Sequence, residues 1–138
     1  MNLSRLALAN RFEVSPKSLV RFWPLLAVLG FALFPIEWLP VLGPILYQVF
    51  PSTGSHFVGH FLLFSTFGGL LLQTFPGLRF RTALYFDLLL LAGIGQETFQ
   101  ALCRQDALIV DTCGDLLTDL SGALVVFLLV RIWGKLVK

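Results

Sequence analysis

The sequence predicts an all-α integral membrane protein, a four-helix bundle with both the N-terminus and the C-terminus in the cytoplasm. Three observations support this prediction. Of the 138 residues, 57% are apolar and only 13% are charged, whereas about 25% of the residues in a soluble domain are charged. Four windows have the roughly 20 mostly apolar residues that a membrane-spanning helix needs. The basic residues, finally, gather on one side of the topology that these windows define.

The first window runs over residues 18–39. Trp23 and Trp38 lie near its ends, where amphipathic rings favour the membrane–water interface. Pro24 falls in the opening turns, where proline is tolerated, and Pro35 is expected to kink or shorten the far end. The window therefore predicts a first span that serves as an uncleaved anchor, since the residues before it are charged and lack the long apolar core of a signal peptide.

The segment 40–55 is apolar and uncharged, but three prolines interrupt it. It is too broken to span a bilayer. An interfacial or re-entrant segment on the outer face and an ordinary amphipathic linker explain it equally well.

The remaining windows cover residues 56–75, 82–103 and 115–133. Pro76 and Gly77 close the second window and predict a tight turn before the third. The loop between the third and fourth windows is flanked by Cys103 and Cys113, which either form a disulfide in an oxidising exterior or remain free thiols. No internal repeat occurs, so residues 1–138 are interpreted as one domain.

The orientation follows from the positive-inside rule. With four spans, the two termini and the turn after residue 75 share one side of the membrane. That side carries nine of the ten basic residues: Arg5, Arg11, Lys17, Arg21, Arg79, Arg81, Arg131, Lys135 and Lys138. The other side carries only Arg104. We therefore expect both termini in the cytoplasm, in a plasma membrane that supplies lipid partners.

Polar side chains gather near the outer ends of all four windows, with Glu37 at that end of the first. The candidate binding residues are His60, Glu97, Gln100, Arg104, Asp115 and Asp119. Within each window, the candidate residues are three or four positions apart, which places their side chains on one face of the helix. His56 lies four positions before His60 and shares its face. Because charges in hydrocarbon cost a few kcal/mol each, they usually face a bundle interior and mark function.

The simplest arrangement is an outward-opening pocket. In it Arg104 neutralises one carboxylate and His60 donates a hydrogen bond to another. Gly122 and Ala123 continue the stripe of the fourth window and would let a neighbouring helix approach closely. A structural ion-pair network among His60, Glu97 and Asp119 explains the same pattern. Interfacial solvation is an alternative for the residues nearest the membrane boundary, which are His56, Arg104, Asp106, Asp111 and Asp115.

The sequence predicts neither a metal ion nor another cofactor. Two histidines four apart, together with carboxylates, are a plausible donor set for zinc, but the H-E-x-x-H pattern is absent. His56 is the first residue of its window, and a place in the adjoining loop would leave one nitrogen ligand. The net charge of +2 and the scattered basic residues exclude a nucleic-acid-binding surface. Walker, dinucleotide and haem motifs are absent as well.

The order of these motifs resembles that of the VanZ-like family. The matching residues are His60–Phe61, Glu97 with Gln100, Arg104, and Asp115 with Asp119 and Gly122–Ala123. The resemblance covers residues 20–133 and implies a small multi-pass protein of the bacterial cell envelope. The family's namesake is associated with low-level resistance to the glycopeptide antibiotic teicoplanin.

The sequence departs from the family pattern at two places. The family usually has an Asp-Lys pair before its histidine, where this chain has His56 and Phe57, and it usually has Asn at the position of Asp119. The first change replaces a cation by an imidazole, and the second adds a carboxylate. Both alter the charge of the predicted pocket, so the roles of individual family residues do not transfer directly.

The leading functional hypothesis is a pocket that binds a lipid headgroup, a lipid-linked cell-wall precursor or a lipophilic glycopeptide. If the ligand is the glycopeptide, the hypothesis includes a role of the protein in low-level antibiotic resistance. In this hypothesis Arg104 holds an anion, Glu97 and Asp119 orient Arg104 or the ligand, and Gln100 and His60 supply hydrogen bonds. One alternative is a membrane enzyme that hydrolyses or transfers a group on a lipid-linked substrate, with His60 or Glu97 as general base. Another is a small subunit or assembly factor of a membrane protein complex, in which the polar stripes join helices.

Overall fold

The computed structural model describes residues 16–34, 40–49, 53–104 and 109–136, and no strand occurs among them. The long helices are α2 (Pro16–Leu33), α4 (Thr53–Thr74), α5 (Thr82–Arg104) and α6 (Ile109–Leu136). A short helix, α3 (Leu42–Val49), precedes α4, and the 3-10 helix η3 (Pro76–Phe80) joins α4 to α5. The all-helical fold class and the predicted turn after residue 75 are confirmed.

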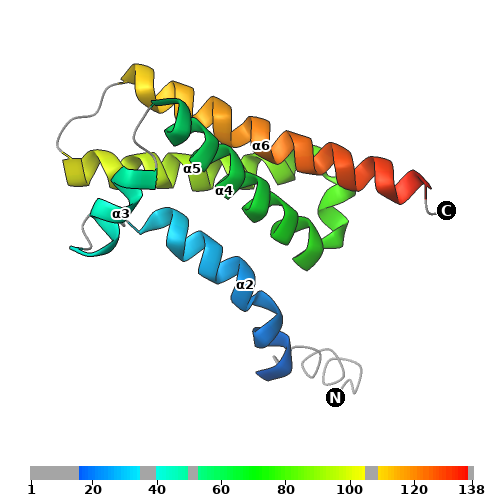
Figure 1. Cartoon of the computed structure of the whole chain (residues 1–138). Helices are drawn as coiled ribbons and strands as arrows, with labels where there is room; N and C mark the ends of the chain where they lie inside the picture. The colour runs from blue at the N-terminus through cyan, green and yellow to red at the C-terminus, as the bar shows by residue number, and fades with distance from the viewer. Residues whose placement is uncertain (1–15, 35–39, 50–52, 105–108, 137–138) are drawn as a thin grey trace, which may run out of the picture.

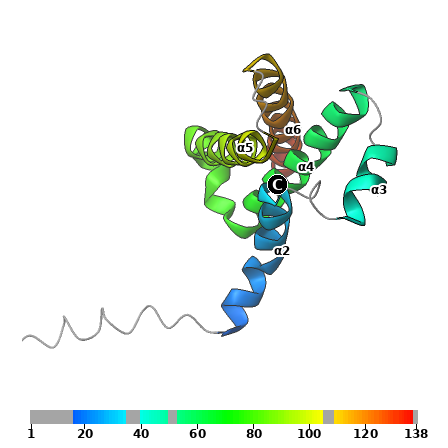
Figure 2. The ribbon, with the colours of Figure 1, turned by 90° about the vertical axis from the view of Figure 1, so that its left-hand side faces the viewer.

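Helices α4, α5 and α6 form the body of the molecule (Figure 1). α4 and α6 run in the same general direction and share the most extensive helix contact, while α5 runs back between their ends. α2 packs against α4 and α5. Figure 2 shows α5 at one side of the group of helices and α3 at the opposite side, with α2, α4 and α6 between them. This connectivity brings the beginnings of α4 and α6 and the end of α5 to the same end of the molecule.

The apolar core lies where α4, α5 and α6 meet. Phe64, Leu72, Tyr85 and Leu89 are its largest fully buried apolar side chains. The Tyr85 hydroxyl donates a hydrogen bond of 3.1 Å to the backbone carbonyl of Ala123 on α6. A buried phenol normally has such a partner, and this one ties the first turn of α5 to the middle of α6.

The closest approach of α4 to α6 occurs at Gly122. A methyl group at this position would press on the carbonyl oxygen of Phe61 and lie 2.9 Å from the hydroxyl oxygen of Ser65. The next residue, Ala123, is completely buried. The prediction that Gly122 and Ala123 allow a neighbouring helix to approach closely is therefore confirmed, and the neighbour is α4.

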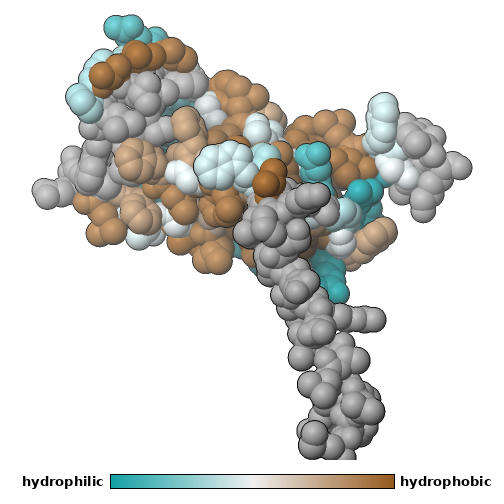
Figure 3. Space-filling model, turned by 90° about the horizontal axis from the view of Figure 1, so that it is seen from below, coloured by the Kyte–Doolittle hydropathy of each residue, from teal (hydrophilic) through white to brown (hydrophobic). Residues whose placement is uncertain are grey.

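The outward faces of the helices are apolar. Exposed leucine, isoleucine, valine and phenylalanine side chains follow α4, α5 and α6, and Trp133 is exposed near the end of α6. Apolar residues predominate over the face drawn in Figure 3. Within the described residues, the segments Gly54–Thr74 and Thr112–Gly134 are each long and apolar enough to cross a membrane. A contiguous apolar surface of this kind is rare on a soluble monomer.

Three helix boundaries differ from the predicted windows. α2 ends at Leu33, whereas the first window extended to residue 39, and residues 35–39 lie outside the described part of the chain. α4 begins at Thr53, three residues earlier than predicted, and α6 begins at Ile109, six residues earlier. The predicted loop before α6 was therefore too long. Gly114 lies inside α6, and a glycine there costs the helix only about 1 kcal/mol.

Candidate functional site

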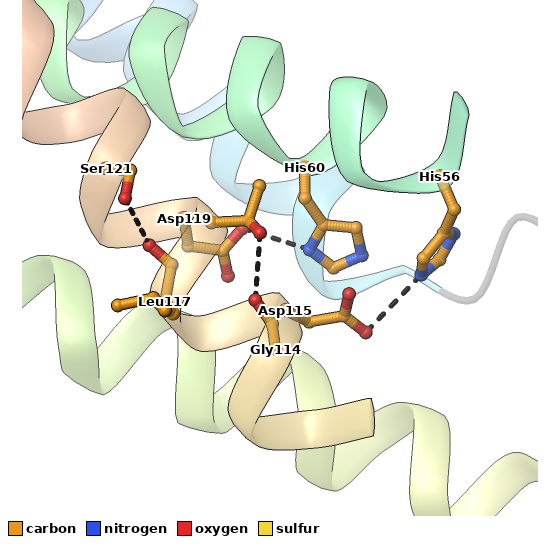
Figure 4. Close-up of polar contacts among 8 residues, drawn as sticks. His56, His60, Gly114, Asp115, Leu117, Asp119 and Ser121 are labelled. Carbon is orange, nitrogen blue, oxygen red and sulfur yellow. Dashed lines mark hydrogen bonds and ion pairs between the residues drawn. The ribbon is translucent and has the colours of Figure 1, made fainter. Parts of the chain in front are cut away.

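Two histidine–aspartate pairs link the first turns of α4 to the first turns of α6 (Figure 4). His60 Nδ1 lies 2.9 Å from Asp119 Oδ1. One turn nearer the end of the bundle, His56 Nε2 lies 3.4 Å from Asp115 Oδ2. A carboxylate only accepts hydrogen bonds, so in each pair the imidazole N–H donates. We call these four residues the His–Asp cluster.

The regular spacing of the cluster follows from the sequence. His56 and His60 are four residues apart, and so are Asp115 and Asp119, which places each pair one turn apart on one helix face. Since α4 and α6 run in the same general direction, one step along α4 matches one step along α6. The two contacts consequently join residues with the same separation of 59 positions.

The two pairs differ in their access to solvent. The inner pair is buried, with 5% of His60 and 1% of Asp119 exposed. The outer pair is open at one edge, because 37% of the His56 side chain is exposed while Asp115 is buried. The cluster is therefore closed to solvent at His60 and Asp119 and accessible to solvent at His56, one helical turn away. A ligand approaching from the end of the bundle would meet His56 first.

Helix α5 adds a third carboxylate to this end of the bundle. Glu97 is buried, and its charge interacts with those of His60, Asp115 and Asp119. Its carboxylate accepts a hydrogen bond from the side chain of Thr112 on α6. Three acidic side chains thus share a small volume with two imidazoles.

Several buried acceptor atoms in this region have no hydrogen-bond partner among the described residues. They are Asp119 Oδ2, Glu97 Oε1 and Gln96 Oε1. A buried polar atom without a partner costs about 1–3 kcal/mol, so such atoms in a native protein call for an explanation. A donor or cation supplied from outside the described residues would satisfy them.

The neighbouring hydroxyl groups of α6 are not part of the cluster. Thr118 donates to the Gly114 carbonyl and Ser121 to the Leu117 carbonyl, both within α6 (Figure 4). Each hydroxyl hydrogen is thus engaged one turn back in its own helix. The chemistry of this end of the bundle rests on the imidazoles and carboxylates.

The structure brings together four of the six predicted binding residues: His60, Glu97, Asp115 and Asp119. Gln100 is half-buried on α5. Arg104 is the last residue of α5, but its side chain lies outside the described part of the chain, so its pairing with a carboxylate stays a prediction. The expected hydrogen bond from His60 to a carboxylate is present, and its acceptor is Asp119. The binding role of all six residues also stays a prediction.

Two residues of this region were misjudged from the sequence. His56 was placed at the boundary between a loop and the second window, but it lies inside the first turns of α4 and pairs with Asp115. Gln96 was passed over although it is 5% exposed. Its burial was predictable from the sequence, because residues three or four positions apart share one face of a helix. Gln96 continues the buried face that carries Tyr85, Leu89 and Gly93.

The predicted disulfide cannot be assigned from the described side chains. Cys113 is exposed in the second turn of α6. The side chain of Cys103, its predicted partner, lies outside the described part of the chain, and the disulfide stays a prediction.

The cluster has a definite chemical character. Among the described residues, the ion pairs at this end contain imidazoles and carboxylates but no lysine or arginine. In neutral His60, Nδ1 carries the hydrogen that is donated to Asp119, and Nε2 then carries the lone pair. Nε2 is therefore free to act as a base, to accept a hydrogen bond or to bind a metal ion.

Comparison with known proteins adds no further constraint. No protein-family model matches the chain, and neither a curated protein nor a solved structure is significantly similar to it. The resemblance to the VanZ-like family therefore rests on the motif residues alone. Any function must be argued from the site itself.

Proposed function

We propose that the chain is a VanZ-like, multi-pass protein of the bacterial plasma membrane whose His–Asp cluster opens toward the outer face and binds a polar headgroup. The headgroup belongs to a lipid, a lipid-linked cell-wall precursor or a lipophilic glycopeptide. One observation carries the proposal: a buried, charged cluster lies at one end of a helix bundle whose outward faces are hydrocarbon. Ionisable groups placed in this way usually mark a binding or transport site.

The membrane assignment rests on the distribution of side chains. Two helices have the length and composition of membrane spans. α5 is also long enough, and its polar residues Gln96 and Glu97 are buried against its neighbours while Leu91 and Ile94 are exposed. This is the reverse of a soluble helix, and lipid is the solvent that accounts for it. α2 completes the proposed set of four spans, and the basic residues place both termini in the cytoplasm.

The headgroup assignment rests on unmatched polar groups. Asp119 Oδ2 and Glu97 Oε1 are buried acceptors without a partner among the described residues, so hydroxyl or ammonium groups of a headgroup would satisfy them. The N-terminal ends of α4 and α6 lie at the same end of the bundle, and helix N-termini favour negative charge. With Arg104 at the end of α5, this end offers an anion-binding side next to an acceptor-rich side. A zwitterionic or phosphate-bearing headgroup matches both.

Ligand binding by the purified protein tests the proposal. The wild-type chain, freed of bound lipid in detergent, is titrated with phosphatidylglycerol, phosphatidylethanolamine, a lipid-linked cell-wall precursor and teicoplanin, each in the presence of EDTA. We expect one of these ligands to bind at one per chain and Glu97→Gln and Arg104→Ala to weaken its binding at least about tenfold, the loss of roughly one charged hydrogen bond. Asp87→Asn, an exposed carboxylate on the opposite half of α5, is the matched control. Equal affinity in all four proteins would rule the pocket out.

A second candidate function is hydrolysis or group transfer on a lipid-linked substrate. The His60–Asp119 pair favours it, because a carboxylate that holds Nδ1–H orients an imidazole as a general base. Turnover of a lipid-linked substrate by the purified protein, lost in His60→Gln and retained in Asp87→Asn, would support an enzyme. Binding without turnover would leave the headgroup receptor.

A further inference from the structure

We propose that His56, His60 and Asp115 bind a divalent first-row transition metal ion, for which Zn²⁺ is the best match. The proposal goes beyond headgroup binding and does not depend on it. The sequence only weakly indicated a metal, because the H-E-x-x-H pattern is absent and His56 stood at the boundary between a loop and a helix. The structure instead places both imidazoles on one face of α4, opposite Asp115 of α6.

The ligand atoms are close to the spacing that a metal requires. One ligand atom from each of the three residues lies within 4.8 Å of the others. In a tetrahedral zinc site with bonds of about 2.0–2.2 Å, neighbouring ligand atoms are roughly 3.3–3.5 Å apart. His56 Nε2 and Asp115 Oδ2 already lie 3.4 Å apart. The remaining separations reach up to 4.8 Å, so the three side chains need to converge by roughly 1 Å to meet this spacing.

Asp119 holds His60 as a metal ligand is usually held. Histidines that bind metals almost always donate their other ring N–H to a carboxylate or carbonyl, which fixes the tautomer and the ring orientation. Asp119 Oδ1 accepts that hydrogen bond from His60 Nδ1 at 2.9 Å. Figure 4 shows the second ring nitrogen of His60 on the side of the ring that faces His56 and Asp115. The inner pair thus orients a ligand, and the outer pair contributes two more.

The charge of the site also favours a cation. Glu97, Asp115 and Asp119 place three carboxylates around two imidazoles, and the described residues contribute no lysine or arginine to their ion pairs. Glu97 Oε1 is a buried acceptor without a partner in the described part of the chain. Its charge interacts with that of Asp115 and adds to the attraction of this region for a cation. A divalent ion would offset much of the cost of this buried negative charge.

The donor set selects the class of metal. Imidazole nitrogen suits zinc and its transition-metal neighbours, whereas Mg²⁺ and Ca²⁺ take oxygen ligands almost exclusively. Three protein ligands with a remaining open position are typical of sites that also bind water or a substrate oxygen. In this protein the open position would face the exposed edge of His56.

The competing explanation is a pair of structural His–Asp contacts that simply join α4 to α6. The two explanations differ in what they require of the outer pair. Structural pairing needs each imidazole to hydrogen-bond its own aspartate. Metal binding needs Asp115 and both imidazoles to converge on one point. The NMR signals of His56 and His60 must therefore shift together when the metal is added.

Titration of the purified full-length chain with Zn²⁺ alone tests the proposal, using a purification tag without histidine. Affinity is measured by competition with a chromophoric chelator, in lipid-free detergent. Because the chain contains two histidines, NMR of histidine-labelled protein reads both rings directly. His56→Ala and Asp115→Asn are the test variants, and Asp87→Asn is the matched control. Helical circular dichroism before titration confirms that each variant is folded.

We expect one Zn²⁺ per chain, simultaneous shifts of both imidazole signals, and affinity lowered at least about tenfold in His56→Ala and in Asp115→Asn but unchanged in Asp87→Asn. Mg²⁺ at the same concentration should shift neither signal. Substoichiometric binding, a shift of His56 alone, or equal affinity in every variant would overturn the proposal. If the test variants do not fold, the wild-type stoichiometry and the two imidazole signals decide. Since neither measurement contains lipid, failure here leaves the headgroup proposal standing.

Discussion

Replacing Gly122 by alanine tests whether the close contact of α4 with α6 holds the His–Asp cluster together. Gly122 lies on α6 three residues after Asp119. The added methyl group would press on the Phe61 carbonyl oxygen and lie 2.9 Å from Ser65 Oγ. Carbon atoms in contact normally keep about 3.5–4.0 Å. The Phe61 backbone cannot rotate away, so the helices must separate by roughly 1 Å.

The cost follows from this geometry. Overpacking a close contact destabilises a protein by about 1–3 kcal/mol, while alanine in place of glycine favours a helix by up to about 1 kcal/mol. Gly134→Ala is the matched control, because it makes the same change in α6 where nothing lies within 4 Å. The difference in unfolding free energy between the two variants removes the shared helix term. We expect Gly122→Ala to be less stable than Gly134→Ala by about 1–3 kcal/mol.

Reversible unfolding in mixed detergent, followed by circular dichroism, measures this difference. The NMR signal of His60 supplies a second readout, since separation of the helices lengthens its hydrogen bond to Asp119. Equal stability of Gly122→Ala and Gly134→Ala, together with an unchanged His60 signal, would refute the close packing of α4 against α6.

Three further predictions follow from the burial of individual groups and from the charge distribution. His60→Ala should lower the unfolding free energy by about 3–5 kcal/mol, because it leaves Asp119 buried without its partner. His56→Ala should cost less, because the His56 edge of its pair is open to solvent and water can reach Asp115 once the ring is removed; equal losses in a denaturation series would contradict the described burial. Tyr85→Phe should cost about 1 kcal/mol by removing the hydrogen bond to the Ala123 carbonyl, and an unchanged unfolding free energy would show that this bond does not stabilise the fold. A fluorescent protein that matures only in the cytoplasm should fluoresce when fused to the C-terminus; dark cells with intact fusion protein would reverse the proposed topology.

Much of the fold was predictable because it depends on spacing along one helix. Apolar windows indicate where helices lie, and the four-residue steps of His56–His60 and Asp115–Asp119 indicate which side chains share a face. Gly122–Ala123 indicated a close helix contact, and the structure contains it. Each of these inferences needs only the sequence of a single helix.

The pairing across helices was harder to predict, because it depends on the relative register of α4 and α6. The sequence indicated that His60 would meet a carboxylate but left three candidates, and the register selects Asp119. Helix starts were also misplaced. Ser, Thr and Gly before His56 were interpreted as a loop, yet α4 begins at Thr53. That shift of less than one turn places His56 inside the helix instead of at its boundary, where it pairs with Asp115.

A crystal structure of the wild-type chain grown in lipid, with anomalous data collected at the zinc edge, tests the central claim most directly. The claim is that the end of the bundle around His60, Glu97 and Asp115 is a ligand site. We predict density for a headgroup, or an anomalous peak, in contact with these side chains at the outer membrane face. The claim would be contradicted if both His–Asp hydrogen bonds were intact, Glu97 were hydrogen-bonded to another protein group, and neither ligand density nor an anomalous peak lay beside these residues. The cluster would then be a structural link between α4 and α6.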